Sequence, residues 1–274
     1  MKYSTGADRS PKDIRTFSYQ PTKANKKGGK RYASKDIEDQ HKVGICTAIS
    51  MTQNARKALG VKFSADFQYL LQKKYFDKNW KEGSSLSAAL KIAKNYGMLP
   101  EEYWTLTTEK DRKLSYDKYI VKLQKVTDAE IEELLKKTVK IRAYASVPVD
   151  RDLMANAIDE SKAGILTRYS LGNEWWRAPV EPIRPPKVQI SGHAVTDSNY
   201  DGDSFRIANT WGTDWADKGT GFRLQAMYTP TECWIPYYED APKHVDEELK
   251  KRTELMGRIQ NIIQMLLELK NKII

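Results

Sequence analysis

The sequence predicts an α+β protein made of two unlike lobes and a separate C-terminal helix. Helical patterns dominate residues 40–137, short β-like runs dominate residues 138–241, and apolar residues recur at heptad spacing within 242–274. Of the 274 residues, 40% are hydrophobic and 30% are charged, which is typical of a folded globular protein. This length accommodates one large two-lobed domain with an appendage.

Residues 1–39 are predicted to form an extended arm that packs on the two-lobed domain, residues 40–241. The stretch is polar and contains several turn-forming residues: Pro11, Pro21, Gly28 and Gly29. Part of the net charge of +10 lies between Lys23 and Lys35, and such a run attracts anionic polymers. Because Tyr32 is the single aromatic residue between Lys23 and Lys35, too few for a stacking surface, we expect a solvated loop and no binding of nucleic acid.

The first lobe is predicted to be helical. Apolar residues recur at helical spacing over 45–59, and Gly60 follows as a stop signal. Serine caps and closing apolar or glycine residues predict further helices over 64–71 and 85–97, and another helix is expected near 128–137. A helix over 45–59 places Cys46 in its first turn.

The second lobe is predicted to be rich in β-structure, with one helix over 151–160. Its β-like runs cover residues 139–147, 164–169, 187–190, 193–196 and 205–208. Because ligand sites favour the junction between lobes, we expect the functional site where the two lobes meet.

The last segment, 242–274, is predicted to be an amphipathic helix with a coiled-coil seam. The seam alternates steps of four and three residues through Leu255, Ile259, Ile262, Leu266, Leu269 and Ile273. An isolated helix with such a broad apolar face is poorly stable in water. Two outcomes are therefore open: a homo-oligomer through residues 249–274, or docking on the chain's own two-lobed domain.

The small number of cysteines indicates in which cellular compartment the protein is found. Cys46 and Cys233 are the only cysteines, too few for a disulfide-stapled secreted scaffold. No stretch approaches the 18 apolar residues of a membrane span, and the opening residues lack the apolar middle of a secretion signal. We expect no membrane partner and a reducing compartment, cytoplasmic or phage-associated, in preference to secretion.

Cys46 is the candidate nucleophile. A thiol at neutral pH is mostly protonated, and the positive end of a helix dipole together with a nearby histidine would favour its thiolate. By itself, a cysteine at a helix start is more often a small buried core residue. Cys233, among Trp234 and Tyr237, is predicted to be such a packing residue.

The neighbours of Cys46 make the prediction specific. In QHKVGIC, Gln40 precedes Cys46, with Gly44 between them, and the later runs SGHAV and IANTWGTDW supply His193 and Asn209. A histidine beside a β-run is commonly a core residue, and an asparagine is commonly a turn former. The combination of four groups in this order favours nucleophilic catalysis.

These motifs resemble those of the papain family of cysteine peptidases, most closely over 40–50 and 191–222. The resemblance implies a two-lobed papain-like fold with a helical left lobe and a β-barrel-like right lobe. It also implies that Gln40 and the Cys46 backbone amide form an oxyanion hole, that Asn209 orients His193, and that Trp211 shields that contact. The stretch around Gly83, Ser84 and Ser85 resembles the family's substrate-binding segment, so these three residues and Trp211 are candidates for substrate binding.

Two departures from the family pattern concern the cleft. Thr47 follows the nucleophile where the family usually has an aromatic residue, and Val43 replaces a disulfide-forming cysteine. Only 45 residues precede Cys46, and we expect no long inhibitory pro-segment among them.

The predicted activity is hydrolysis of peptide bonds in a protein or peptide substrate, with no metal or other cofactor. The alternative is a papain-like structural or binding module assembled through its C-terminal helix. A transglutaminase or acetyltransferase with a Cys-His-Asp order is disfavoured because Asn209 is an amide and Gln40 keeps the peptidase spacing.

Overall fold

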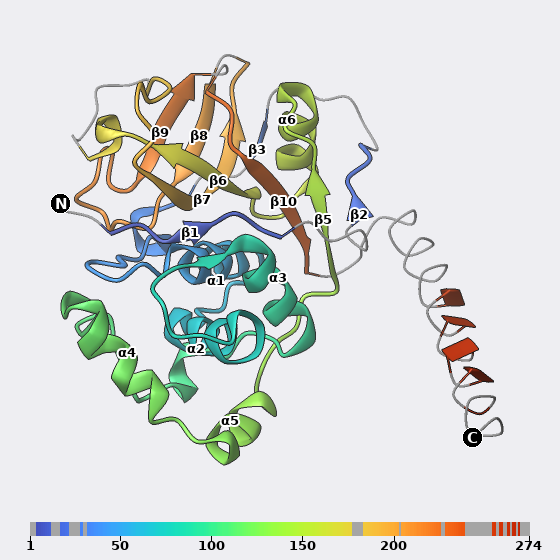
Figure 1. Cartoon of the computed structure of the whole chain (residues 1–274). Helices are drawn as coiled ribbons and strands as arrows, with labels where there is room; N and C mark the ends of the chain where they lie inside the picture. Colours follow the sequence, from blue (N-terminus) through green and yellow to red (C-terminus); the bar gives the residue numbers. More distant parts are fainter. Residues whose placement is uncertain are drawn as a thin grey trace. The chain divides into compact units, whose positions relative to one another are not determined.

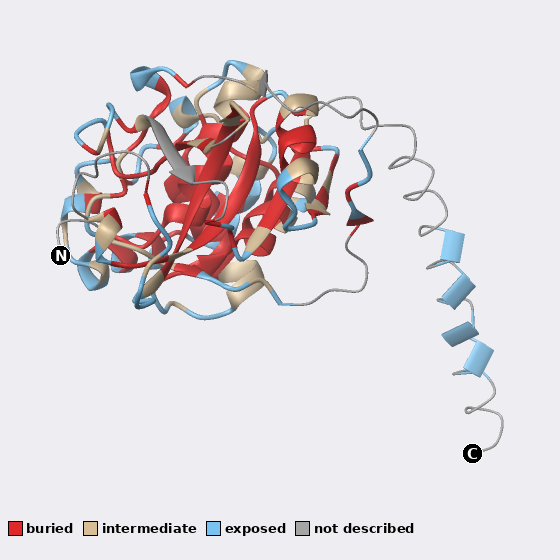
Figure 2. Cartoon of the chain, turned by 90° about the horizontal axis from the view of Figure 1, so that it is seen from above, coloured by how far each residue is buried: buried red, intermediate tan, exposed pale blue. Residues whose placement is uncertain are grey.

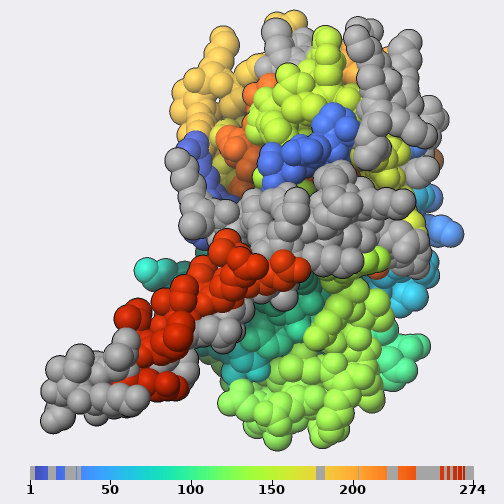
Figure 3. Space-filling view, turned by 90° about the vertical axis from the view of Figure 1, so that its right-hand side faces the viewer, coloured from blue at the N-terminus to red at the C-terminus, as the bar shows by residue number. Residues whose placement is uncertain are grey.

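The computed structural model describes residues 4–11, 17–21, 28–29, 32–176, 183–202, 204–225 and 228–238. In the C-terminal segment it describes 254–255, 258–259, 262–263, 265–266 and 268. The chain divides into two compact units, Met1–Tyr238 and Glu239–Ile274. Within the first unit, a helical lobe lies against a sheet lobe (Figure 1; Figure 3).

The helical lobe begins with α1 (Cys46–Leu59), which ends at Gly60 in the left-handed conformation (φ 74°). Its other helices are α2 (Ala65–Leu71), continued by a π-helical stretch (Gln72–Asp77), α3 (Leu86–Asn95), α4 (Tyr116–Gln124) and α5 (Asp128–Leu135). The expected serine caps are present: Ser64 accepts from the Phe67 amide and Ser85 from the Ala88 amide. The helices predicted over 45–59, 64–71, 85–97 and near 128–137 are thus confirmed, and α4 is an addition.

The core of this lobe is built from the buried faces of these helices and the loops between them. Phe67 and Trp104 pack at its centre, with ring centroids 5.4 Å apart. Other fully buried members include Ile49, Tyr69, Leu70, Tyr119, Leu123 and Ile131. Helices α1, α2, α4 and α5 each contribute apolar residues to this core, and their removal from water stabilises the lobe.

The sheet lobe is one eight-stranded sheet in the order β2-β5-β10-β6-β7-β8-β9, with β3 paired to β7. The described strands do not close into a barrel. Their bounds are β2 Phe17–Ser18, β3 Gly28–Gly29, β5 Ala143–Val147, β6 Ile165–Leu171, β7 Ser191–Tyr200, β8 Ser204–Ala208, β9 Thr220–Gln225 and β10 Glu232–Tyr237. Helix α6 (Arg151–Glu160) packs against it, with its N-terminus capped by Asp150.

One predicted strand is wrong. Residues 187 and 188 form a bend, and residues 189 and 190 are irregular. The Ile190 amide donates to the Leu171 carbonyl at 2.7 Å. Val188 and Ile190 are exposed, so this apolar run has no buried face against which a strand would pack.

Buried aromatic rings fill one face of the sheet. Trp175 stacks on Trp215 with centroids 5.9 Å apart, and Trp211 lies edge-on to both. In Figure 2, the buried residues gather in the strands and in the central helix behind them. This cluster gives β7 and the loop after β8 a rigid backing.

The N-terminal segment lies between the two lobes. Strand β1 (Ala7–Asp8) pairs in parallel with β4 (Ser84–Ser85), the short strand just before α3. Figure 1 shows this blue segment crossing between α1 and α3 on one side and the sheet on the other. Short 3₁₀ helices occur at Ser34–Asp36, Glu101–Tyr103, Asp111–Lys113 and Asn173–Trp175.

The described positions of the C-terminal segment are helical and exposed. Leu255, Ile262 and Leu266 are 56%, 51% and 59% exposed, and Ile263 and Met265 are similarly open. The predicted seam residues Leu269 and Ile273 lie outside the described residues. No described helix combines the length and apolar character needed to cross a membrane.

Candidate active site

Cys46 is the first residue of α1 and is completely buried. Backbone groups of Ala194, Gly6 and Thr47 lie close enough to its sulfur to favour the thiolate slightly. Burial outweighs them and raises the pKa of the Cys46 thiol to about 11. At neutral pH this thiol is therefore protonated.

His193 lies on β7, and its neighbour Ala194 contacts the Cys46 sulfur. Its Nε2 is 2.7 Å from Asn209 Oδ1, and its ring stacks on Trp211 with centroids 4.5 Å apart. Since Asn209 Oδ1 can only accept, Nε2 carries the proton. Nδ1 is buried and has no hydrogen-bond partner among the described residues. Burial lowers the pKa of His193 to about 4, so the ring is neutral.

Thr210 links the histidine to Gln40. Its amide donates to Asn209 Oδ1 at 2.8 Å, and its hydroxyl donates to Gln40 Oε1 at 2.6 Å. Because Oε1 of Gln40 is held this way, Nε2 of the same amide faces the cleft. The four predicted catalytic residues are thus connected or adjacent in space: Gln40, Cys46, His193 and Asn209.

A buried ion cluster supports the loop that carries Gln40. Arg112 is 3% exposed and binds Asp66 at 2.9 Å, Glu38 at 3.2 Å and the Asp39 carbonyl at 3.3 Å. Its own carbonyl accepts the Lys42 amide. Glu38 and Asp39 before Gln40, and Lys42 after it, are therefore all anchored to Arg112.

The cleft is filled by the chain itself. We call residues 4–10 the strap. The Ser4 carbonyl accepts hydrogen bonds from Gln40 Nε2 and Trp211 Nε1, both at 2.9 Å. The Gly6 backbone reaches the Cys46 sulfur. The sequence led us to expect no long inhibitory pro-segment. It did not predict that a short segment, the strap, would lie against Gln40, Trp211 and Cys46.

The strap continues past Cys46 with further backbone contacts. The Gly6 carbonyl accepts from the Ser84 amide at 2.8 Å, and the Ala7 carbonyl accepts from Arg168 Nε at 2.7 Å. The absence of a side chain at Gly6 is required, since a β-carbon there would overlap the carbonyl of Gly44. Thr5 adds a hydroxyl contact to Ser191 at 2.5 Å.

The candidate substrate-binding residues meet the strap rather than open solvent. Ser84 and Ser85 are buried and pair with Ala7 and Asp8. Gly83 has φ 92°, and its carbonyl accepts Lys73 Nζ at 2.7 Å. Trp211 covers His193 and also donates to Ser4, as described above.

Three residues of the site were not predicted from the sequence: Glu82, Thr210 and Arg168. Glu82 accepts the Gly44 amide at 2.6 Å and the Ser4 hydroxyl at 3.3 Å. The Thr210 hydroxyl donates to Gln40 Oε1, and Arg168 Nε donates to the Ala7 carbonyl of the strap. Thr210 directly follows Asn209 in the motif IANTWGTDW, so the sequence already indicated that it lies near the site. Neither Glu82 nor Arg168 belongs to any local pattern.

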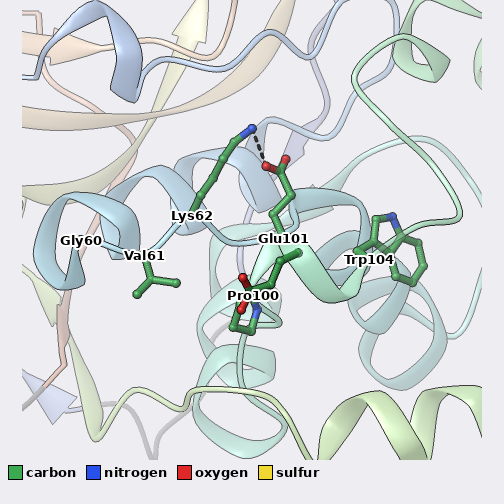
Figure 4. Close-up of a pocket in the computed structure, with 7 residues that line it drawn as sticks. Gly60, Val61, Lys62, Pro100, Glu101 and Trp104 are labelled. Atoms are coloured by element: carbon green, nitrogen blue, oxygen red, sulfur yellow. Dashed lines mark ion pairs between the residues drawn. The ribbon is translucent and has the colours of Figure 1, made fainter.

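Two hollows on the helical lobe lie away from this chemistry. One, of about 680 Å³, is lined by Gly60, Val61, Lys62, Pro100, Glu101, Glu102 and Trp104 (Figure 4). The other, lined by residues from Tyr103 to Leu134, adjoins α5. The first lies at the end of α1 opposite Cys46, and the Lys62–Glu101 ion pair at 2.7 Å closes one side of it.

The fold is that of the papain-like cysteine proteases. The chain is similar to xylellain, a cysteine protease from Xylella fastidiosa, with 20% identity and a TM-score of 0.69 over 87% of this chain and 97% of that one. It is also similar to the Carica candamarcensis protease CMS1MS2 in complex with E-64, at 16% identity and TM-score 0.55, covering 74% and 93% of the two chains.

A third similar structure is the ragweed pollen cysteine protease Amb a 11 in its proform. The identity is 18% and the TM-score 0.56, over 80% of this chain and 68% of that one. No family model matches the sequence, and no curated protein matches it.

Proposed function

We propose that the chain is a cysteine peptidase with Cys46 as nucleophile, His193 as acid and base, Asn209 as orienting residue and Gln40 as oxyanion donor. The observation that carries the proposal is the placement of Cys46 at a helix N-terminus beside the strand of His193. The Asn209 contact fixes Nε2 of that ring and leaves Nδ1 for the thiol. The papain-like fold, shared with proteins named as cysteine proteases, supports the same activity.

In the proposed mechanism, the Cys46 thiolate attacks the carbonyl carbon of a peptide bond, and Gln40 Nε2 and the Cys46 backbone amide stabilise the oxyanion. Protonated His193 then donates its proton to the leaving amine, which gives an acyl-enzyme thioester. Neutral His193 next takes a proton from water, and the resulting attack releases the acid and restores the thiol.

Labelling and substitution of Cys46 test this proposed activity. E-64, the ligand of one similar structure, should label the chain once, at Cys46, when the strap is displaced as described below. Cys46→Ala should abolish both labelling and cleavage of a mixed peptide library. Cys233→Ala, which changes the other buried cysteine, is the matched control and should keep both. Cleavage that persists in Cys46→Ala would rule out the proposed nucleophile.

We further propose that the strap holds the peptidase latent. The Gly6 backbone lies beside the Cys46 sulfur and acts on it in the direction that favours the thiolate. The carbonyl bound by Gln40 belongs to Ser4, in a different peptide unit. The strap therefore lies against both the proposed nucleophile and the proposed oxyanion donor, and substrate can bind only after the strap leaves.

Gly6→Val tests latency in the full chain. Its side chain would overlap the Gly44 backbone, so the strap should leave the cleft, and peptide cleavage should rise at least about tenfold. Arg9→Ala, an exposed change in the same segment, should leave the rate unchanged. Equal rates in the unaltered chain and in Gly6→Val, with both folded, would contradict a latent state.

The domain limits at 39/40 and 241/242 and the self-association of 249–274 remain proposals. The observation that favours association is the exposure of neighbouring apolar residues, including Leu255, Ile262 and Leu266, on the described part of that helix. A second copy of the same helix would cover such a face by heptad packing.

A further inference from the structure

Arg168 is a buried cation in the floor of the candidate active site. It lies on β6, opposite Ala194 on β7 and Glu232 on β10. The residue is 5% exposed, and its charge acts on the Cys46 sulfur in the direction that favours the thiolate. Its Nε donates to the Ala7 carbonyl at 2.7 Å and its Nη1 to Thr231 Oγ1 at 2.8 Å.

The charge of Arg168 is not neutralised at close range. Within the described part of the chain, no carboxylate lies at ion-pair distance from its guanidinium. Glu232 and Asp8 act on it only from farther away. The Glu232 oxygens accept from the Ser10 amide and Trp234 Nε1. Burial of a guanidinium without a carboxylate is unfavourable, so this position favours an anion.

The neighbouring buried cation provides the contrast. Lys73 is 2% exposed and binds Asp77 at 2.9 Å, so it has its own carboxylate. Arg168 instead has two uncharged acceptors, one of which belongs to the strap. When the strap leaves, Arg168 Nε loses its acceptor, the Ala7 carbonyl oxygen. Its N–H group can then donate to a substrate in the cleft.

Gly192 creates the room for this arrangement. A β-carbon at that position would overlap both the Arg168 guanidinium and the Ala7 carbonyl. Gly192 directly precedes His193, so the space it leaves is part of the same cleft. A substrate group that replaces the Ala7 oxygen there would contact the guanidinium and lie next to the reacting atoms.

We infer that Arg168 is a specificity residue that selects peptides with an aspartate or glutamate side chain at the position bound beside Gly192 and Ala194. The carboxylate takes the place of the Ala7 carbonyl oxygen and forms a charge-assisted bond with the guanidinium. This inference rests on the proposed peptidase function. It adds the substrate class, an acidic peptide.

The test is a positional-scanning library of fluorogenic tetrapeptide amides, cleaved by the full chain and by its Gly6→Val variant. We expect Asp and Glu to be preferred over Gln and Leu by at least about tenfold at one position before the scissile bond. Arg168→Leu, in the Gly6→Val chain, should remove that preference by raising KM for acidic peptides. Arg168→Lys should retain it in part, and Arg151→Leu, which removes an exposed arginine on α6, should change nothing.

Each outcome decides a different point. Absence of cleavage and of Cys46 labelling in both chains contradicts the proposed function. Cleavage with no acidic preference at any position overturns the role of Arg168, and this result does not depend on whether Arg168→Leu folds. An acidic preference that persists in folded Arg168→Leu also overturns it. A preference lost in Arg168→Leu and retained in Arg168→Lys supports it.

Discussion

At the scale of single residues, burial sets the resting protonation of the site. The same desolvation raises the pKa of Cys46 and lowers the pKa of His193, because it disfavours the charged form of each. The resting site therefore contains a neutral thiol and a neutral imidazole. The proposed mechanism requires a Cys46 thiolate and a protonated His193, so we expect Cys46 to become reactive only when water enters the cleft.

The pH dependence of Cys46 alkylation follows from this state. With a thiol pKa of about 11, the thiolate fraction at pH 7 is about 10⁻⁴. The fraction rises with pH, so the rate of iodoacetamide labelling should increase about tenfold per pH unit and level off only near pH 11. In Gly6→Val, the plateau should move to about pH 8.5 or lower. Mass spectrometry of the Cys46 peptide measures both rates. A plateau below pH 9 in the unaltered chain would contradict the occluded state.

At the scale of elements, the loop that carries Gln40 depends on contacts from another segment. Arg112 joins Glu38 in this loop to Asp66 in α2, and the three side chains are nearly completely buried. Tyr119 on α4 donates to the same Asp66 carboxylate at 2.8 Å. The helical lobe thus fixes the loop of Gln40, the proposed oxyanion donor, through one ion cluster.

Loss of that cluster should be costly. Arg112→Met leaves the carboxylates of Glu38 and Asp66 buried without their cation, and we expect the free energy of unfolding to fall by about 3–5 kcal/mol. Urea unfolding measures this value. Arg151→Ala, on an exposed face of α6, should change it by no more than about 0.5 kcal/mol. A loss below about 1 kcal/mol in Arg112→Met would show that the cluster contributes little.

At the scale of the whole molecule, the association that we propose involves the C-terminal unit. Ile262→Glu places a charge on the exposed apolar face, where Ile262 is 51% exposed. If that face pairs with a second copy, the particle mass from light scattering should fall from more than one chain to one, because a buried charge is unfavourable. Glu254→Gln, a polar change on the same helix, should keep the larger mass. A mass of one chain for the unaltered protein would contradict association.

Local patterns alone determined the first-lobe helices α1, α2, α3 and α5, though not α4, together with several strands and the order of the four candidate catalytic residues. Capping and helical spacing act between near neighbours, which is why Ser64, Ser85 and Gly60 mark element ends in both sequence and structure. The run 187–190 misled the prediction, because an apolar stretch becomes a strand only when a partner covers it.

Only the tertiary structure decided that the cleft is closed, that Cys46 and His193 are neutral, and that Arg168 faces the strap. The contacts responsible join residues far apart in the chain: Trp211 to Ser4 across 207 positions and Arg168 to Ala7 across 161. Such contacts leave no periodic trace, since they depend on backbone carbonyls that every sequence contains. The residue types therefore predicted which groups could react, and the packing of the strap determined whether they are free to do so.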